Sequence, residues 1–172
     1  MPGRFKCGLK HAVIGLFTVA LTGVVSCESI DNKRLPSVPV NIVFSTSAMW
    51  NTYGVSGALD TQRFILTQFE RVPRDFPYAA STSTGYGGIL LVCDYYGNPI
   101  AYDLACPVES RSDVRIKVNS ESKLAECPVC HSTYAIFENF GHPLSGIAAE
   151  HGYGLQRYQV VNGRNDYMVI TR

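Results

Sequence analysis

Short apolar runs, bounded by glycine, proline and asparagine, dominate the chain after residue 39. Such runs lie at 40–44, 64–66, 89–94, 100–104, 135–137, 155–161 and 167–170, and the segment 114–118 alternates apolar with basic residues. Runs of this length, rich in β-branched and aromatic side chains, are typical of strands, whereas an amphipathic helix needs a longer repeat with apolar positions three and four apart. The pattern predicts an all-β domain of antiparallel strands, with one short helical turn near 48–53.

A different pattern occupies the start of the chain. Three basic residues within the first ten precede a predominantly apolar run at 12–25, which ends at Ser26-Cys27. The run is shorter than the roughly 20 residues of a membrane-spanning helix and is typical of a secretory signal. The four residues that end in Cys27 resemble a bacterial lipobox, which implies cleavage before Cys27 and attachment of lipid to its sulfur. We therefore expect residues 1–26 to be a lipoprotein signal peptide, with an uncleaved N-terminal anchor helix as the alternative.

The rest of the chain divides into a linker and one domain. Residues 27–39 are polar and carry Pro36 and Pro39, which predicts a flexible tether too poor in apolar residues to pack. Residues 40–172 then suffice for one domain of ordinary size. A lipidated cysteine places this domain outside the cytoplasm, anchored to a membrane of the cell envelope, at its periplasmic face or on the cell surface.

Charge and motifs exclude two classes of function. The 172 residues carry a formal net charge of +1, with a pI near 7.6, and no basic cluster is interleaved with aromatics, so nucleic acid is not an expected partner. The chain contains neither a G-x-S-x-G nor an H-E-x-x-H motif, and its carboxylates are scattered. We expect an electron carrier or a non-catalytic module rather than a stand-alone enzyme.

The remaining chemistry lies in two cysteine-bearing segments. The apolar hairpin at 89–104 runs directly into Cys106-Pro107-Val108-Glu109. Twenty residues lie between Cys106 and the second segment, Cys127-Pro128-Val129-Cys130-His131. Two cysteine-bearing tight loops separated by a β excursion can direct their sulfurs and backbone N–H groups at one ion or cluster. The spacing therefore predicts a metal site on Cys106, Cys127 and Cys130.

These segments resemble the two boxes of the Rieske [2Fe–2S] domain family. Cys106 and Cys127 match the cysteine of each box, the positions of Pro128, Ser132 and Tyr134 also agree, and 141–148 is similar to the loop that covers the cluster. The resemblance extends over roughly 87–170. It implies an antiparallel β-sandwich with a small two-loop subdomain at about 105–148, a [2Fe–2S] cluster, and electron transfer with a partner protein. It also implies that Ser132 and Tyr134 donate hydrogen bonds to sulfur.

The chain departs from the family at the ligand positions. Val108 stands where the first histidine ligand is expected, Cys130 stands where the second is expected, and His131 replaces a glycine. Three positions thus remain able to bind metal, and a fourth ligand is open. The candidates for that fourth ligand are His131, Glu109, His142 and Cys93, although an apolar strand makes core packing the expected role of Cys93.

Three other interpretations stay open beside the iron–sulfur one. Cys127-x-x-Cys130 is a normal spacing for zinc, which accepts three cysteines and a fourth group. In an oxidising compartment the same two cysteines can instead form a disulfide, and four cysteines allow three pairings in all. Alternatively, the domain binds no cofactor and keeps its fold for packing or for binding a partner. Iron–sulfur binding is the leading hypothesis, and a zinc- or disulfide-stabilised or cofactor-free binding module is the alternative.

Overall fold

The fold is all-β, as the pattern predicts. A computed structural model describes residues 29–162 and 167–170. The strands in this part of the chain are β1 (Val40–Phe44), β2 (Thr61–Leu66), β3 (Arg71–Val72), β4 (Ser83–Thr84), β5 (Ile89–Cys93), β6 (Pro99–Asp103), β7 (Lys117–Val118), β8 (Leu124–Glu126), β9 (Thr133–Ala135), β10 (His142–Ser145), β11 (Arg157–Asn162) and β12 (Tyr167–Ile170). The helices are α1 (Ser47–Tyr53), α2 (Gly146–His151) and the 3-10 turn η1 (Asn139–Gly141).

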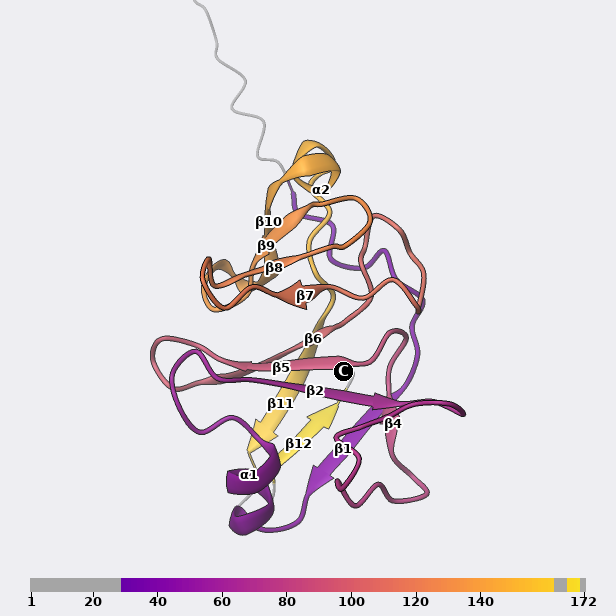
Figure 1. Cartoon of the computed structure of the whole chain (residues 1–172), viewed down its shortest axis with the longest axis vertical. Coiled ribbons are helices and arrows are strands. Elements are labelled where there is room, and N and C mark those ends of the chain that lie inside the picture. Colours follow the sequence, from indigo (N-terminus) through magenta and orange to yellow (C-terminus); the bar gives the residue numbers. More distant parts are fainter. Residues whose placement is uncertain (1–28, 163–166, 171–172) are drawn as a thin grey trace, which may run out of the picture.

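The strands form two antiparallel sheets of unequal size. The large sheet has the order β3-β2-β5-β6-β11-β12-β1-β4, and the small sheet has the order β10-β9-β8-β7. The large sheet curls so that β2, next to one edge strand, comes close to β4, the other edge strand. There the Leu66 N–H of β2 donates a hydrogen bond of 3.1 Å to Thr84 Oγ1 of β4. The small sheet and α2 lie at one end of the molecule, and α1 lies at the other (Figure 1). The first cysteine loop connects β6 of the large sheet to β7 of the small sheet, and the second connects β8 to β9 within the small sheet.

Strand β5 separates two hydrophobic cores. Its five residues are all buried, because its two faces contact different clusters. Leu90 and Val92 face the upper core, which lies against the small sheet, whereas Ile89, Leu91 and Cys93 face the lower core inside the curl. A strand covered on both sides is apolar at every position rather than at alternate ones, and this explains the unbroken apolar run in the sequence.

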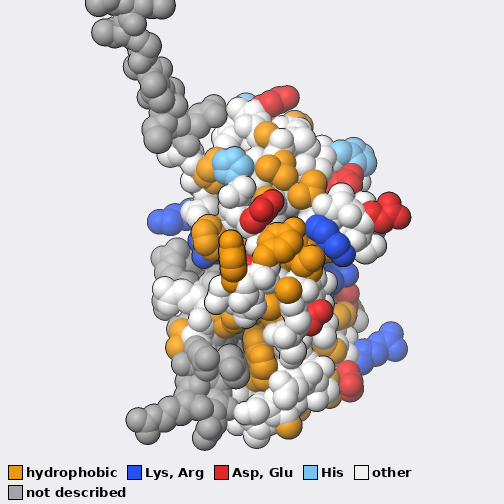
Figure 2. Space-filling view, turned by 90° about the vertical axis from the view of Figure 1, so that its left-hand side faces the viewer, with side chains coloured by type: hydrophobic (Ala, Val, Ile, Leu, Met, Phe, Trp, Pro, Cys, Tyr) orange, Lys and Arg blue, Asp and Glu red, His pale blue; other side chains and the backbone are white. Residues whose placement is uncertain are grey.

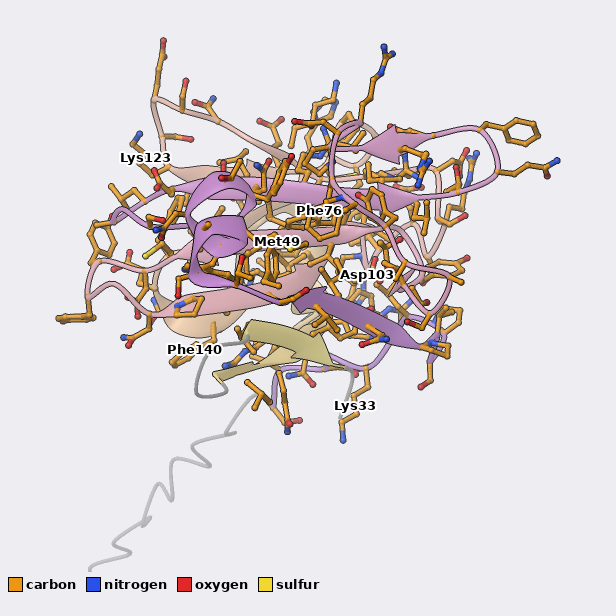
Figure 3. All side chains as sticks on the ribbon, turned by 90° about the horizontal axis from the view of Figure 1, so that it is seen from below. Lys33, Met49, Phe76, Asp103, Lys123 and Phe140 are labelled. Atoms are coloured by element: carbon orange, nitrogen blue, oxygen red, sulfur yellow. The ribbon has the colours of Figure 1, made fainter. Side chains whose placement is uncertain are left out.

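Aromatic rings fill the lower core. Phe76 packs edge-on against Phe44 and Phe64, with ring centroids 5.6 and 5.2 Å apart, and Trp50 of α1 packs against Phe44 at 5.0 Å. Figure 3 views this end of the molecule from below, with α1 and Phe76 toward the viewer. Edge-to-face contacts of this kind favour a defined arrangement of rings, so the lower core forms a rigid base for the large sheet, from whose strand β6 the first cysteine loop leaves.

Asp103, at the end of β6, fixes the approach to the first cysteine loop. Its side chain is fully buried, and Oδ1 accepts hydrogen bonds from the N–H groups of Gly87 and Ala105 at 3.0 and 2.7 Å. Oδ2 accepts from the Tyr86 N–H at 3.0 Å and from the Tyr158 hydroxyl at 2.6 Å. Burial raises the pKa of Asp103, and these four hydrogen bonds oppose that rise. The carboxyl joins three separate segments immediately before the cysteine.

The structure differs from the sequence prediction in three segments. The predicted tether is packed along part of its length, because Leu35 is buried and Asp31 forms a bridge to Tyr153. Only Lys117–Val118 of the predicted strand at 114–118 pairs as a strand, and Arg115 forms an isolated bridge to Ala105. The expected covering loop contains strand β10 and helix α2.

The N-terminal predictions lie outside the described residues. The proposed signal peptide and Cys27 belong to the segment before residue 29. Within the part of the chain that the structure describes, no helix has the length and apolar character needed to span a membrane.

Candidate metal centre

Two tight loops hold the three cysteines of the predicted site. The first leaves β6, and its ends are closed by hydrogen bonds from the Cys106 N–H to Val114 O (3.0 Å) and from the Ser110 N–H to Cys106 O (2.9 Å). The second connects β8 to β9. Its closure comes from the His131 N–H to Cys127 O (3.1 Å) and from the Cys127 N–H to Ser132 O (3.0 Å). Backbone hydrogen bonds, rather than side-chain packing alone, therefore set the positions of the sulfurs.

The three sulfurs come together at one point. The Sγ atoms of Cys106, Cys127 and Cys130 all lie within 4.8 Å of one another, and Cys106 and Cys130 approach to 3.6 Å. Cys106 and Cys127 are fully buried, whereas Cys130 is half-buried. Among the residues that the structure describes, no other group of three or more cysteine, histidine or acidic side chains is so arranged. Three soft ligands on one point can hold a metal ion.

Hydrogen-bonding groups surround these sulfurs. The Val129 N–H donates to Cys127 Sγ at 3.5 Å, the Tyr134 hydroxyl lies 3.7 Å from Cys106 Sγ, and Ser132 Oγ lies 3.4 Å from Cys130 Sγ. Ser132 is fully buried, and its Oγ also accepts a hydrogen bond of 3.1 Å from the Ala148 N–H of α2. Ser132 and Tyr134 thus lie beside the sulfurs, where they can adjust the charge of a thiolate centre.

The surroundings of the three thiols shift their pKa values in different directions. Burial raises the pKa of Cys106 to about 12, and burial also raises the pKa of Cys127. Burial acts in the same direction on Cys130, but its hydrogen bonds with Ser132, Cys127 and Cys106 together outweigh burial, and the pKa of Cys130 falls below its ordinary value. In the metal-free protein Cys130 is therefore the thiol that ionises first, and it is also the most accessible of the three.

None of the four proposed fourth ligands joins the sulfurs. His131 projects into solvent, with 72% of its side chain exposed, and its Nδ1 lies 3.2 Å from Glu126. His142 is exposed on β10, and Glu109 is half-buried beyond the first loop. Cys93 faces the lower core, on the opposite side of β5 from the site, so its proposed role as a ligand is wrong and its role is core packing.

Two features of the site carry no signal in the sequence. The first is the pairing of Cys106 with Cys130, which come from different loops and are 24 positions apart in the chain. The second is the contact of α2 with Ser132, which holds the hydroxyl that faces Cys130.

Comparisons with protein-family models, with curated proteins and with solved structures find no match.

Proposed function

We propose that this protein is a lipid-anchored metal protein of the cell envelope, in which an iron–sulfur centre carries single electrons between partners. The observation that supports the proposal is the convergence of three thiols from two loops within 4.8 Å. Thiolate sulfur is the ligand that iron–sulfur clusters select. Cys106, Cys127 and Cys130 fit such a group and would supply three of its four ligands.

The surroundings of the thiols support a redox role. One-electron exchange is the chemistry that an iron–sulfur cluster supplies when bound, and hydrogen bonds to the sulfurs set its potential. The Val129 N–H, Ser132 and Tyr134 are already directed at the three sulfurs. Cys130 is half-buried and the neighbouring Val129 is 55% exposed, so a partner can approach this side of the centre.

The resemblance to Rieske domains points to the same function. It rests on the two cysteine boxes, in which Val108 removes one histidine ligand and Cys130 replaces the other with a thiolate. Because the histidine pair raises the potential of Rieske centres, we expect this centre to have a lower potential than they do. The lipobox before Cys27 supports attachment of the protein to a membrane outside the cytoplasm.

A single zinc ion is the second candidate, and one distance favours it. Two sulfurs bound to one tetrahedral zinc lie about 3.8 Å apart, given zinc–sulfur bonds of about 2.3 Å. The 3.6 Å between Cys106 and Cys130 is close to this value. In that case the metal would join the two loops and stabilise the small sheet, and the protein would serve as a binding module without redox chemistry.

Metal and inorganic sulfide analysis of the anaerobically purified protein tests the proposal. We expect about two irons and two sulfides per chain with visible absorbance, as a [2Fe–2S] centre requires. One zinc and no sulfide would establish the second candidate, and a colourless protein without metal would contradict both. Cys127→Ser should abolish metal binding, whereas the matched substitution Cys93→Ser in the lower core should leave the metal content unchanged.

A further inference from the structure

The described chain begins at the end of the molecule that carries the cysteine site (Figure 1). Ser29 lies against Gly152, because a Cβ on that glycine would be 3.5 Å from Ser29 O. The Asp31 N–H donates to Gly152 O at 2.8 Å, and the Gly154 N–H donates to Asp31 O at 2.9 Å. Residues 29–35, which we call the strap, are thus fixed to the C-terminal end of α2.

Further contacts hold the strap beside the first cysteine loop. The Arg34 guanidinium lies 3.7 Å above the ring of Tyr153, and its Nε donates to Pro107 O at 3.0 Å. Leu35 is buried. The chain therefore cannot swing freely about residue 39, as a flexible tether would. Residues 29–35 are therefore held close to α2.

The distance to the anchor follows from the sequence. Ser29 is two positions after Cys27, with only Glu28 between them. An extended chain covers at most about 3.6 Å per residue, so a chain of this length spans at most about 7 Å. The polar layer of a bilayer is roughly 5–7 Å deep on each side. A lipid on Cys27 would therefore bring the end of α2 to the surface of the membrane.

This end of the molecule exposes apolar side chains. Leu144 of β10 is 45% exposed, and Ile147 of α2 is 44% exposed. Hydrophobic side chains are visible on the surface at the upper end in Figure 2, beside polar and histidine side chains. On the strap and α2, Asp31 and Glu150 balance the charges of Lys33 and Arg34, so this surface has no net attraction for anionic lipid. A surface without net charge suits zwitterionic lipid, with Leu144 and Ile147 as its apolar contacts.

We infer that Leu144 and Ile147 rest on the bilayer to which the protein is anchored, so that the cysteine centre faces the membrane. The centre lies directly beneath this surface, because Ser132 Oγ contacts both Cys130 Sγ (3.4 Å) and the Ala148 N–H of α2 (3.1 Å). The anchor makes the contact intramolecular, so two partly exposed apolar side chains suffice for it. The inference rests on the proposed function only through the lipid on Cys27.

Quenching of tryptophan fluorescence by brominated lipid tests this orientation. The full-length lipidated protein is reconstituted into phosphatidylcholine vesicles, with and without bromine on the acyl chains. Trp50, the one tryptophan of the chain, lies on α1 at the opposite end and serves as the internal control (Figure 1). We expect no quenching in the wild type. In Ile147→Trp about half of the emission should be lost, because one of two indoles then enters the boundary that interfacial side chains reach at ~5–10 Å depth.

Two further variants separate surface contact from nonspecific adsorption. Leu144→Asp in the Ile147→Trp background should restore the emission, whereas Phe69→Asp, at a 93% exposed position in the β2–β3 turn of the large sheet, should leave the quenching unchanged. Equal quenching of the wild type and of Ile147→Trp, or none in either, would overturn the inference.

Two measurements on the same samples distinguish its failure from that of the proposed function. If mass spectrometry finds no lipid on Cys27, the proposed anchor and the inferred orientation are both contradicted, whereas the proposed metal centre is unaffected. If lipidated protein binds no metal but shows the expected quenching, the inferred orientation is supported and the proposed electron carrier is contradicted.

Discussion

At the scale of single residues, buried polar groups decide where the cysteine loops lie. Asp103 accepts four hydrogen bonds in a site that excludes water, and three of the donors are backbone N–H groups. If an amide replaces the carboxyl, its NH2 group faces one of those donors, and that donor then has no acceptor. An unsatisfied buried group costs about 1–3 kcal/mol. The side chain that organises the site is therefore not one of its ligands.

Asp103→Asn should destabilise the protein by about 1–3 kcal/mol in urea unfolding at neutral pH. The pKa of Asp103 is raised above its ordinary 3.8 by burial. The folded wild type therefore holds its proton longer than the unfolded chain, and its stability falls as the pH rises through this interval. Since the amide does not titrate, the cost of the substitution should be largest at pH values near or below 3.8 and should shrink as the pH rises. Asp113→Asn, at an exposed position paired with Arg111, should change stability by less than about 0.5 kcal/mol.

At the scale of elements, the contact between α2 and the second cysteine loop controls the environment of Cys130. Gly146, the first residue of α2, has a φ of 72°, and a Cβ there would lie 2.8 Å from Ser132 Oγ. The glycine is needed both for its backbone conformation and for the space that Ser132 occupies. Helix and loop are thus in contact without a gap that a methyl group can enter.

Gly146→Ala should destabilise the protein by about 1–3 kcal/mol more than Gly97→Ala, through overpacking of Ser132. Gly97 is the matched control, because its φ is 88° and a Cβ added there would have no neighbour within 4 Å. Both substitutions carry the strain of a left-handed conformation, and only the first adds a clash. Equal losses of stability in urea unfolding would show that Ser132 moves aside freely.

The positions of the two loops also predict a disulfide between Cys106 and Cys130, whereas the short spacing in the sequence favours Cys127 with Cys130. Oxidised glutathione added to the metal-free protein should take two electrons and two protons from Cys106 and Cys130, whose sulfurs lie 3.6 Å apart, and release two molecules of reduced glutathione. The accessible Cys130 thiolate begins the exchange, because its pKa is lowered. Peptide mapping would identify the linkage, and a dominant Cys127–Cys130 disulfide would contradict this prediction. Cys93→Ser should not alter the product.

At the scale of the whole molecule, the strap joins the start of the domain to the end that carries the cysteines. Its attachment depends on the burial of Leu35 and on the backbone pairing of Asp31 with Gly152 and Gly154. These contacts involve only a short segment, so the strap can open locally while both cores stay folded. Its opening would release residues 29–35 from α2 without changing the positions of the three cysteines.

Leu35→Ala should increase the opening of the strap. A loss of about 2 kcal/mol of buried contact corresponds to roughly thirtyfold faster amide exchange at Gly154, whose N–H is bonded to Asp31 O. Amides of β5, between the two cores, should keep their protection. Lys33→Ala, at an exposed position of the same strap, is the control and should leave the exchange at Gly154 unchanged.

The sequence by itself determined the class of fold and the three cysteines of the candidate site. Strand runs such as 89–93 are apolar because both of their faces are covered, so the residues of the run by themselves indicate a buried strand. The cysteines could be chosen because soft ligands in tight, proline-bearing loops are a local signal. The expected packing of Cys93 in the core followed from its apolar strand in the same way.

Only the tertiary structure decided which groups meet. The 3.6 Å approach of Cys106 to Cys130, the exclusion of His131 and His142 from the sulfurs, and the packing of the strap on α2 all join segments that are distant in the chain or depend on the direction of a side chain. Such contacts arise from how two loops close and how a sheet curls, and no local pattern of residues records them. The ligand chemistry of the candidate site could thus be predicted from the sequence, whereas its geometry comes from the fold.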